Sequence, residues 1–148
     1  MLIHRIAAQL YKVDALRTVE SALGRGDDVT LAVAQSARTL LAAAQFARDP
    51  RPTVYIVSGE EAAERAARSL AAYVGLEHVA RYPERRDYPW KDTEPEAAVI
   101  ASRCEALERM HRGDACIMVA SARALLRCVP PAGENYFSSQ RFAVGEEV

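Results

Sequence analysis

Short runs of apolar residues alternate along this chain with longer segments in which apolar residues recur at helical spacing. The runs are Val29–Val33, Thr53–Val57 and Cys116–Ala120, with a weaker one at Glu77–Tyr82. Because nearly every position in the three main runs is apolar, they predict strands of a parallel sheet covered on both faces. The segments between them predict helices over Asp14–Leu23, Ser36–Arg48, Glu60–Val74 and Glu96–Arg112, and a short one from Ser121.

The segment Glu60–Val74 carries the clearest helix signals. Ser58 and Glu61 have the spacing of a capping box, and Gly75 follows the last helical position. Oppositely charged residues also recur four positions apart, as in Glu61 and Arg65, which is typical of a solvated helix face.

Strands that alternate with helices predict an α/β fold with a mainly parallel sheet and right-handed crossovers. We divide the chain into a helical lead-in over residues 1–28, a main domain over residues 29–133, and a tail over residues 134–148. The tail breaks the α/β rhythm, and Arg141–Val144 could form one strand. It ends without a cap or a charged segment, so we expect the chain to be cut from a longer protein.

Composition narrows the class of protein. The chain has 148 residues, half of them apolar, and a net charge of −1, which excludes a wholly basic nucleic-acid binder. It has neither a signal-peptide pattern nor an apolar stretch that would span a membrane, so we expect a cytoplasmic protein. Its three cysteines are far apart, so we interpret them as buried apolar residues of a reducing compartment and expect no metal site.

The first predicted strand leads into a helix at the position where nucleotide-binding enzymes place a phosphate loop, G-x-x-x-x-G-K-[ST]. Ala32 stands at the first glycine, Ala37 at the second, Arg38 at the lysine and Thr39 at the Ser/Thr. Cβ atoms at positions 32 and 37 obstruct the turn that lets backbone N–H groups approach phosphate oxygens. The residues of this degenerate phosphate loop are Ala32, Gln35, Ser36, Ala37, Arg38 and Thr39. The plain alternative is a strand-to-helix connection with Ser36 as the N-cap.

The acid that would hold Mg²⁺ is also missing. The apolar runs are followed by Ala34, Ser58 and Ser121, and no Asp-Glu pair follows any of them. We therefore predict no catalytic residues and no ATP or Mg²⁺ bound by this chain. The alternatives are a working P-loop ATPase or helicase domain with an unusual loop, and a receiver domain, which would need a phospho-acceptor Asp at a strand end.

A loop rich in arginine and aromatic residues follows the weaker strand. Arg85, Arg86, Tyr88, Trp90 and Lys91 could contact nucleic acid, because bases stack on aromatic rings and phosphates bind cations. The alternative is a proline-stiffened loop that packs on a neighbouring domain. Four acidic residues in the same stretch weaken its positive field and favour that alternative.

The order of these segments from Val29 to Pro131 resembles the N-terminal UvrB-like module of transcription-repair coupling factors, the bacterial Mfd proteins. AVAQSARTLLAAAQFA resembles UvrB's phosphate-loop strand and helix with the glycines eroded, and TVYIVSGEEAAERAARSLAAYVG resembles the next strand and helix. RYPERRDYPWKDTEP matches the family's aromatic and proline loop, Ser102-Arg103 fits the succeeding helix, and IMVASARALLRCVPP resembles the closing segment. UvrB itself carries a long tyrosine-rich hairpin that is absent here, which favours the coupling factor.

This resemblance, over about two-thirds of the chain, implies a three-layer RecA/P-loop-like domain that acts as a scaffold in transcription-coupled nucleotide excision repair. It implies a parent that recruits UvrA, binds RNA polymerase and translocates on double-stranded DNA. ATP and Mg²⁺ would bind only in the parent's motor domains. The partners of this chain would then be other domains of the parent, and its UvrA-binding insert would begin no earlier than the tail.

Overall fold

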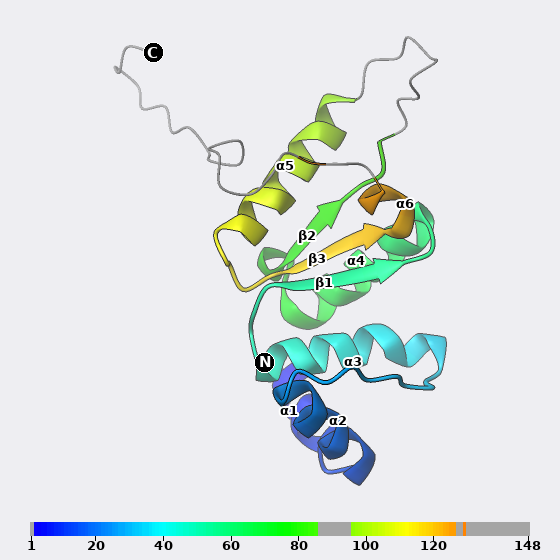
Figure 1. Ribbon diagram of the computed structural model, residues 1–148, viewed down its shortest axis with the longest axis vertical. Helices are drawn as coiled ribbons and strands as arrows, with labels where there is room; N and C mark the ends of the chain where they lie inside the picture. Colours follow the sequence, from blue (N-terminus) through cyan, green and yellow to red (C-terminus); the bar gives the residue numbers. More distant parts are fainter. Residues whose placement is uncertain (1, 86–95, 127–128, 130–148) are drawn as a thin grey trace, which may run out of the picture.

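The computed structural model describes residues 2–85, 96–126 and 129 (Figure 1). The elements in chain order are α1 (Leu2–Leu10), α2 (Asp14–Gly24), α3 (Gln35–Arg48), β1 (Thr53–Val57), α4 (Glu60–Val74), the 3₁₀ turn η1 (Leu76–His78), β2 (Val79–Tyr82), α5 (Ala97–His111), β3 (Ile117–Ser121) and α6 (Ala122–Leu125).

The three strands form one parallel sheet in the order β1-β3-β2. In its register Thr53 and Val79 both pair with Ile117. The chain passes from β1 through α4 to β2, and then returns through α5 to the central strand β3. The predicted α/β fold with a parallel sheet is confirmed, and so are three of the four predicted strands.

Helices cover the two faces of the sheet differently (Figure 1). On one face, Leu70 of α4 and Phe46 of α3 pack with Ile117 and Val119 in the largest apolar cluster. On the other face, Ala106 of α5 packs in a second cluster with side chains of β2 and β3. The result is a three-layer α/β arrangement, in which α3 packs against α4 and α1 packs against α3.

The lead-in helices pack on α3. Ile3 of α1 is buried in the same cluster as Phe46, so α1 shares the core of the main domain. Tyr11 donates a hydrogen bond to Gln45 of α3, and the Arg48 guanidinium lies 4.5 Å from the centre of its ring. Arg48 also pairs with Glu20 of α2. Helix α2 itself has no fully buried residue among its eleven.

The ends of α4 confirm one prediction and correct another. Gly75 has φ +101°, a conformation that favours glycine, and the helix ends there as predicted. The capping box is wrong: Gly59 is the N-cap, so Ser58 stands one position before the cap and makes no capping hydrogen bond. The ion pair between Glu61 and Arg65 forms as predicted.

The prediction of a strand at Val29–Val33 is wrong. These residues belong to neither a strand nor a helix, and Leu31 is 44% exposed. A strand exists only when its backbone pairs with a neighbour, and no other strand of the described residues lies beside this segment. An apolar run supplies the propensity for a strand but cannot supply the partner.

The buried face of α5 also differs from the prediction for the cysteines. Cys116 is buried as expected, but Cys104 of α5 is exposed, and Cys128 lies outside the described residues. Arg103 and Ala106 face the sheet instead, since α5 is rotated so that Cys104 and Ile100 point to solvent.

Candidate functional site

The residues of the degenerate phosphate loop lie just before α3 and in its first turns. Ala32, Gln35, Ser36 and Arg38 are exposed, while Ala37 and Thr39 are half-buried. The helix begins at Gln35 with Ala34 as its N-cap, and no side chain caps it, so the proposed N-cap role of Ser36 is wrong. No strand precedes the helix within the described residues, so the strand-loop-helix frame of a phosphate loop is not formed there.

Arg38 of α3 lies near Tyr55 of β1. Burial raises the pKa of the Tyr55 hydroxyl above its usual value, and the nearby Arg38 cation offsets part of that rise. The position that carries lysine in a nucleotide site therefore holds a guanidinium that acts on a tyrosine of the sheet.

The carboxyl ends of the parallel strands are where open α/β sheets bind ligands. Here β1 leads to Ser58 and Gly59, β2 leads to Pro83, and the hydroxyl of Ser121 accepts a hydrogen bond from the Ala124 N–H to cap α6. The residues directly after the three strands are Ser58, Pro83 and Ala122, and none of these is acidic.

Two carboxylates near the carboxyl ends of the strands, those of Glu60 and Glu84, form ion pairs with arginines. Glu60 in the first turn of α4 pairs with Arg81 and accepts a hydrogen bond from the Glu84 backbone N–H at 3.0 Å. The Glu84 carboxylate pairs with Arg123 at 3.2 Å. This arrangement, hereafter the edge network, consists of Glu60, Arg81, Glu84 and Arg123. It fixes the turn after β2, and its acids are paired with arginine.

Arg103 is a buried residue of this region to which the sequence analysis gave no chemical role. It is 7% exposed, its guanidinium lies 3.8 Å from the centre of the Tyr82 ring, and it donates hydrogen bonds to the Tyr82 hydroxyl and to the Pro83 carbonyl at 2.8 Å. Burial raises the pKa of Tyr82, and Arg103 offsets part of that rise. The signal was present in the sequence, because Arg103 falls four residues from Val99 and from Leu107 on one helix face.

Of the predicted nucleic-acid or interdomain contacts, only Arg85 is described. It is half-buried and close enough to Tyr82 to affect its pKa. Arg86, Tyr88, Trp90 and Lys91 lie outside the described residues, so that prediction stays a prediction.

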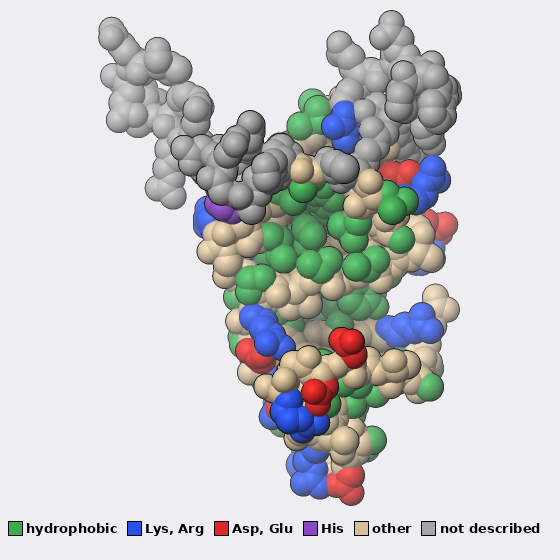
Figure 2. Space-filling model, in the orientation of Figure 1, with side chains coloured by type: hydrophobic (Ala, Val, Ile, Leu, Met, Phe, Trp, Pro, Cys, Tyr) green, Lys and Arg blue, Asp and Glu red, His purple; other side chains and the backbone are tan. Residues whose placement is uncertain are grey.

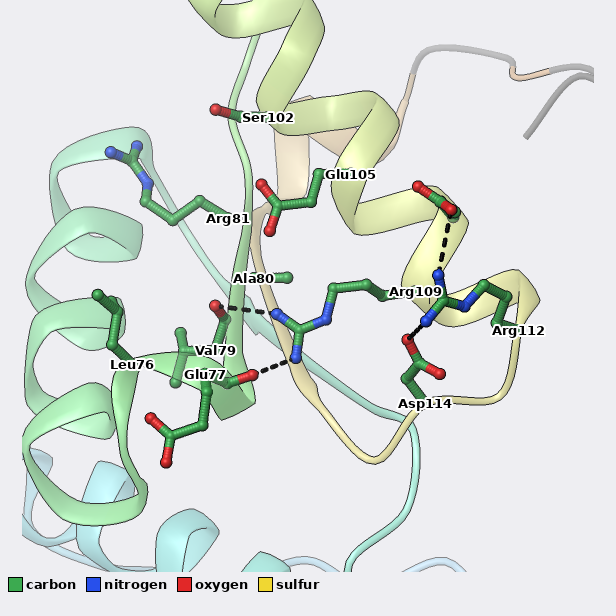
Figure 3. A pocket seen from close by; sticks show the side chains of 11 residues that line it. Leu76, Glu77, Val79, Ala80, Arg81, Ser102, Glu105, Arg109, Arg112 and Asp114 are labelled. Carbon is green, nitrogen blue, oxygen red and sulfur yellow. Dashed lines mark hydrogen bonds and ion pairs between the residues drawn. The ribbon is translucent and has the colours of Figure 1, made fainter. Parts of the chain in front are cut away.

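A groove of about 900 Å³ runs between α5 and the outer edge of β2 (Figure 3). Arg109 reaches across it and donates hydrogen bonds to the backbone carbonyls of Glu77 and Val79. Arg112 pairs with Glu108 at 3.2 Å and with Asp114 at 3.1 Å. Arg109 and Arg112 therefore bind backbone carbonyls and carboxylates of the protein itself at this end of the groove.

Within the described part of the chain, there is neither a metal-binding cluster nor a membrane-spanning helix. In residues 2–85, 96–126 and 129, no group of three or more His, Cys, Asp or Glu side chains could hold a metal ion. No helix in the described part of the chain has both the length and the apolar character needed to cross a membrane.

Comparison with known proteins assigns no family. No family model, curated protein or solved structure matches this chain.

Proposed function

We propose that this chain is a non-catalytic scaffold domain of a transcription-repair coupling factor and acts in transcription-coupled nucleotide excision repair. The observation that carries the proposal is the state of the phosphate-loop position. Alanine stands at both glycine positions, α3 starts at Gln35 without a preceding strand, and the lysine position holds Arg38, which lies near Tyr55. An eroded nucleotide site on an α/β fold suits a domain that has kept the architecture and lost the catalysis.

The chemistry of the sheet edge supports the same proposal. A nucleotide-hydrolysing site needs a carboxylate free to help hold Mg²⁺. The carboxylates of Glu60 and Glu84 are instead paired with Arg81 and Arg123. ATP and Mg²⁺ then belong to the motor domains of the proposed parent protein.

A scaffold domain must hold in fixed positions the segments through which the chain leaves it. The edge network and Arg103 anchor residues 83–85 and α6, from which the chain continues toward the arginine-aromatic loop and the Pro130-Pro131 segment. In the proposal these segments meet other domains of the parent, which in turn contacts UvrA, RNA polymerase and double-stranded DNA in the cytoplasm.

Strand-specific repair tests this function in cells. Deleting the gene that encodes this chain should slow removal of ultraviolet lesions from the transcribed strand of an active gene to the rate of the other strand. An allele with Thr39→Ala, at the position that would hold Mg²⁺ in a phosphate loop, should keep the faster repair of the transcribed strand, because no nucleotide role is assigned to Thr39. Unchanged transcribed-strand repair in the deletion strain would show that the chain has no part in this pathway.

A further inference from the structure

The two outer strands of the sheet, β1 and β2, differ in how open their outward backbone groups are to another strand. On the β2 edge, Arg109 donates to the carbonyls of Glu77 and Val79, and the Val79 N–H donates to the Leu76 carbonyl. The strand has four residues and is followed by Pro83, which has no N–H. Short length, a proline and a blocking arginine are devices that keep another strand from pairing with an edge. The β2 edge is closed in this way.

The β1 edge lacks those devices. The Thr53 N–H donates to the Cys116 carbonyl at 2.9 Å, so residues 53, 55 and 57 direct their backbone groups toward β3. The N–H and C=O groups of Val54 and Ile56 therefore point outward, and no other strand of the described residues pairs with them. This strand is wholly uncharged and rich in β-branched residues, as strands that pair readily are.

The side chains of the same two residues are exposed as well. Val54 is 42% and Ile56 is 56% exposed, on the sheet face that α5 covers only over β2 and β3. Figure 2 shows hydrophobic side chains gathered over the sheet on this side of the molecule. A strand added beside β1 would satisfy the outward backbone groups and place its own apolar side chains against Val54 and Ile56.

A cation stands near this edge. Arg38 is exposed in the first turn of α3, lies near Tyr55 of β1, and makes no ion pair with any other described residue. Since α3 ends at Arg48 just before β1 begins, its first turn lies toward the carboxyl end of β1. An acidic group at that end of an added strand would complement Arg38.

We propose that the open β1 edge, with Arg38 beside it, binds an extended apolar segment of a partner polypeptide that ends in acidic residues. The segment pairs parallel to β1 through the backbone of Val54 and Ile56, and its acidic end lies against Arg38. This binding surface is separate from any nucleotide chemistry and goes beyond the scaffold role proposed above.

Synthetic peptides test this surface on the full chain. The probe is a fluorescein-labelled peptide TVIVTDE, and its control is TVIVTKK, which keeps the strand but reverses the charge. Fluorescence anisotropy measures affinity at low salt, and ¹⁵N-¹H correlation spectra locate the amides that shift. We expect TVIVTDE to bind about tenfold more tightly than TVIVTKK, and the Val54 and Ile56 amides to shift while those of β2 do not.

Three variants separate the contributions. Ile56→Pro removes one outward N–H without removing a hydrogen bond to β3, and should weaken TVIVTDE about tenfold. Ile56→Lys keeps that N–H and places a charge on the open face, which gives a second route to the same test if the proline variant does not fold. Arg38→Glu should reverse the preference between the two peptides.

The proposal fails if neither peptide binds the folded chain, if the two bind equally, or if Ile56→Pro and Ile56→Lys leave affinity unchanged. It also fails if sedimentation shows a dimer of the chain that Ile56→Lys dissociates, because a second copy would then be the occupant of the edge.

Discussion

Replacing Arg103 by methionine removes a buried guanidinium from the junction of α5, β2 and α6. Its contacts are the ring and hydroxyl of Tyr82, the Pro83 carbonyl at 2.8 Å and the Ala124 carbonyl at 3.4 Å. Each hydrogen bond from a charged donor contributes about 1.5–3 kcal/mol, and a desolvated cation on an aromatic face about 1–2 kcal/mol. Methionine refills the stem and removes the cost of burying a charge, so we expect a net loss of about 2–4 kcal/mol of unfolding free energy.

Urea unfolding followed by far-ultraviolet circular dichroism measures this loss. The matched control is Arg65→Met on the solvated face of α4, where the arginine side chain is 55% exposed and pairs with Glu61. That control should change the unfolding free energy by less than about 0.5 kcal/mol. A second readout is the pKa of Tyr82, which should rise further once the cation that lowers it is gone. An Arg103→Met protein as stable as the Arg65→Met control would refute the role given to Arg103.

Three other perturbations follow from the packing and the titrations. Leu70→Ala, at a fully buried side chain, should cost about 2–5 kcal/mol in urea unfolding, whereas Leu76→Ala, at a side chain 77% exposed, should cost far less; equal losses would contradict the assigned core. Thermal unfolding should show that Gly75→Ala, at φ +101°, destabilises the protein by about 1–2 kcal/mol. Gly24→Ala, which has open space for a Cβ, should be neutral or stabilising in the same measurement. Because the folded pKa of Tyr82 is raised, its stabilising contribution is complete below the usual tyrosine pKa of about 10 and should be lost as pH rises above that value through the raised folded pKa. Tyr82→Phe should flatten that fall in unfolding free energy, and an unchanged slope would speak against it.

Sequence patterns predicted the elements whose signals are local. The helix Glu60–Val74 and the strand Thr53–Val57 have the predicted bounds, and Ser121 caps the helix that follows it. Gly75 predicts the end of α4 and the apolar run predicts β1 from a few neighbouring residues, so neither prediction depends on the rest of the fold.

The errors arise where distant partners decide the outcome. Val29–Val33 has the composition of a strand, but pairing depends on a neighbouring strand that a local pattern cannot supply. Cys104 and Arg103 are neighbours on α5, and only the rotation of that helix against β2 and β3 decides which one is buried. Composition favours burying the cysteine, whereas the acceptors at Tyr82 and Pro83 make burial of the arginine favourable.

For the candidate site, the sequence could predict only which residues of a nucleotide site are missing. The alanines at the two glycine positions and the lack of an acid after the strands were legible in the sequence. The edge network could not be foreseen, because Glu60, Arg81, Glu84 and Arg123 come from four separate parts of the chain and meet only in the folded sheet.

Isothermal titration of the folded chain with Mg·ATP tests the central claim most directly. The eroded phosphate loop and the paired carboxylates of the edge network predict no heat beyond that of dilution at Mg·ATP concentrations up to about a millimolar. That concentration is well above the Kd of an ordinary nucleotide site. Saturable binding of one Mg·ATP per chain with a micromolar Kd, abolished by Arg38→Ala, would contradict the account of a non-catalytic scaffold.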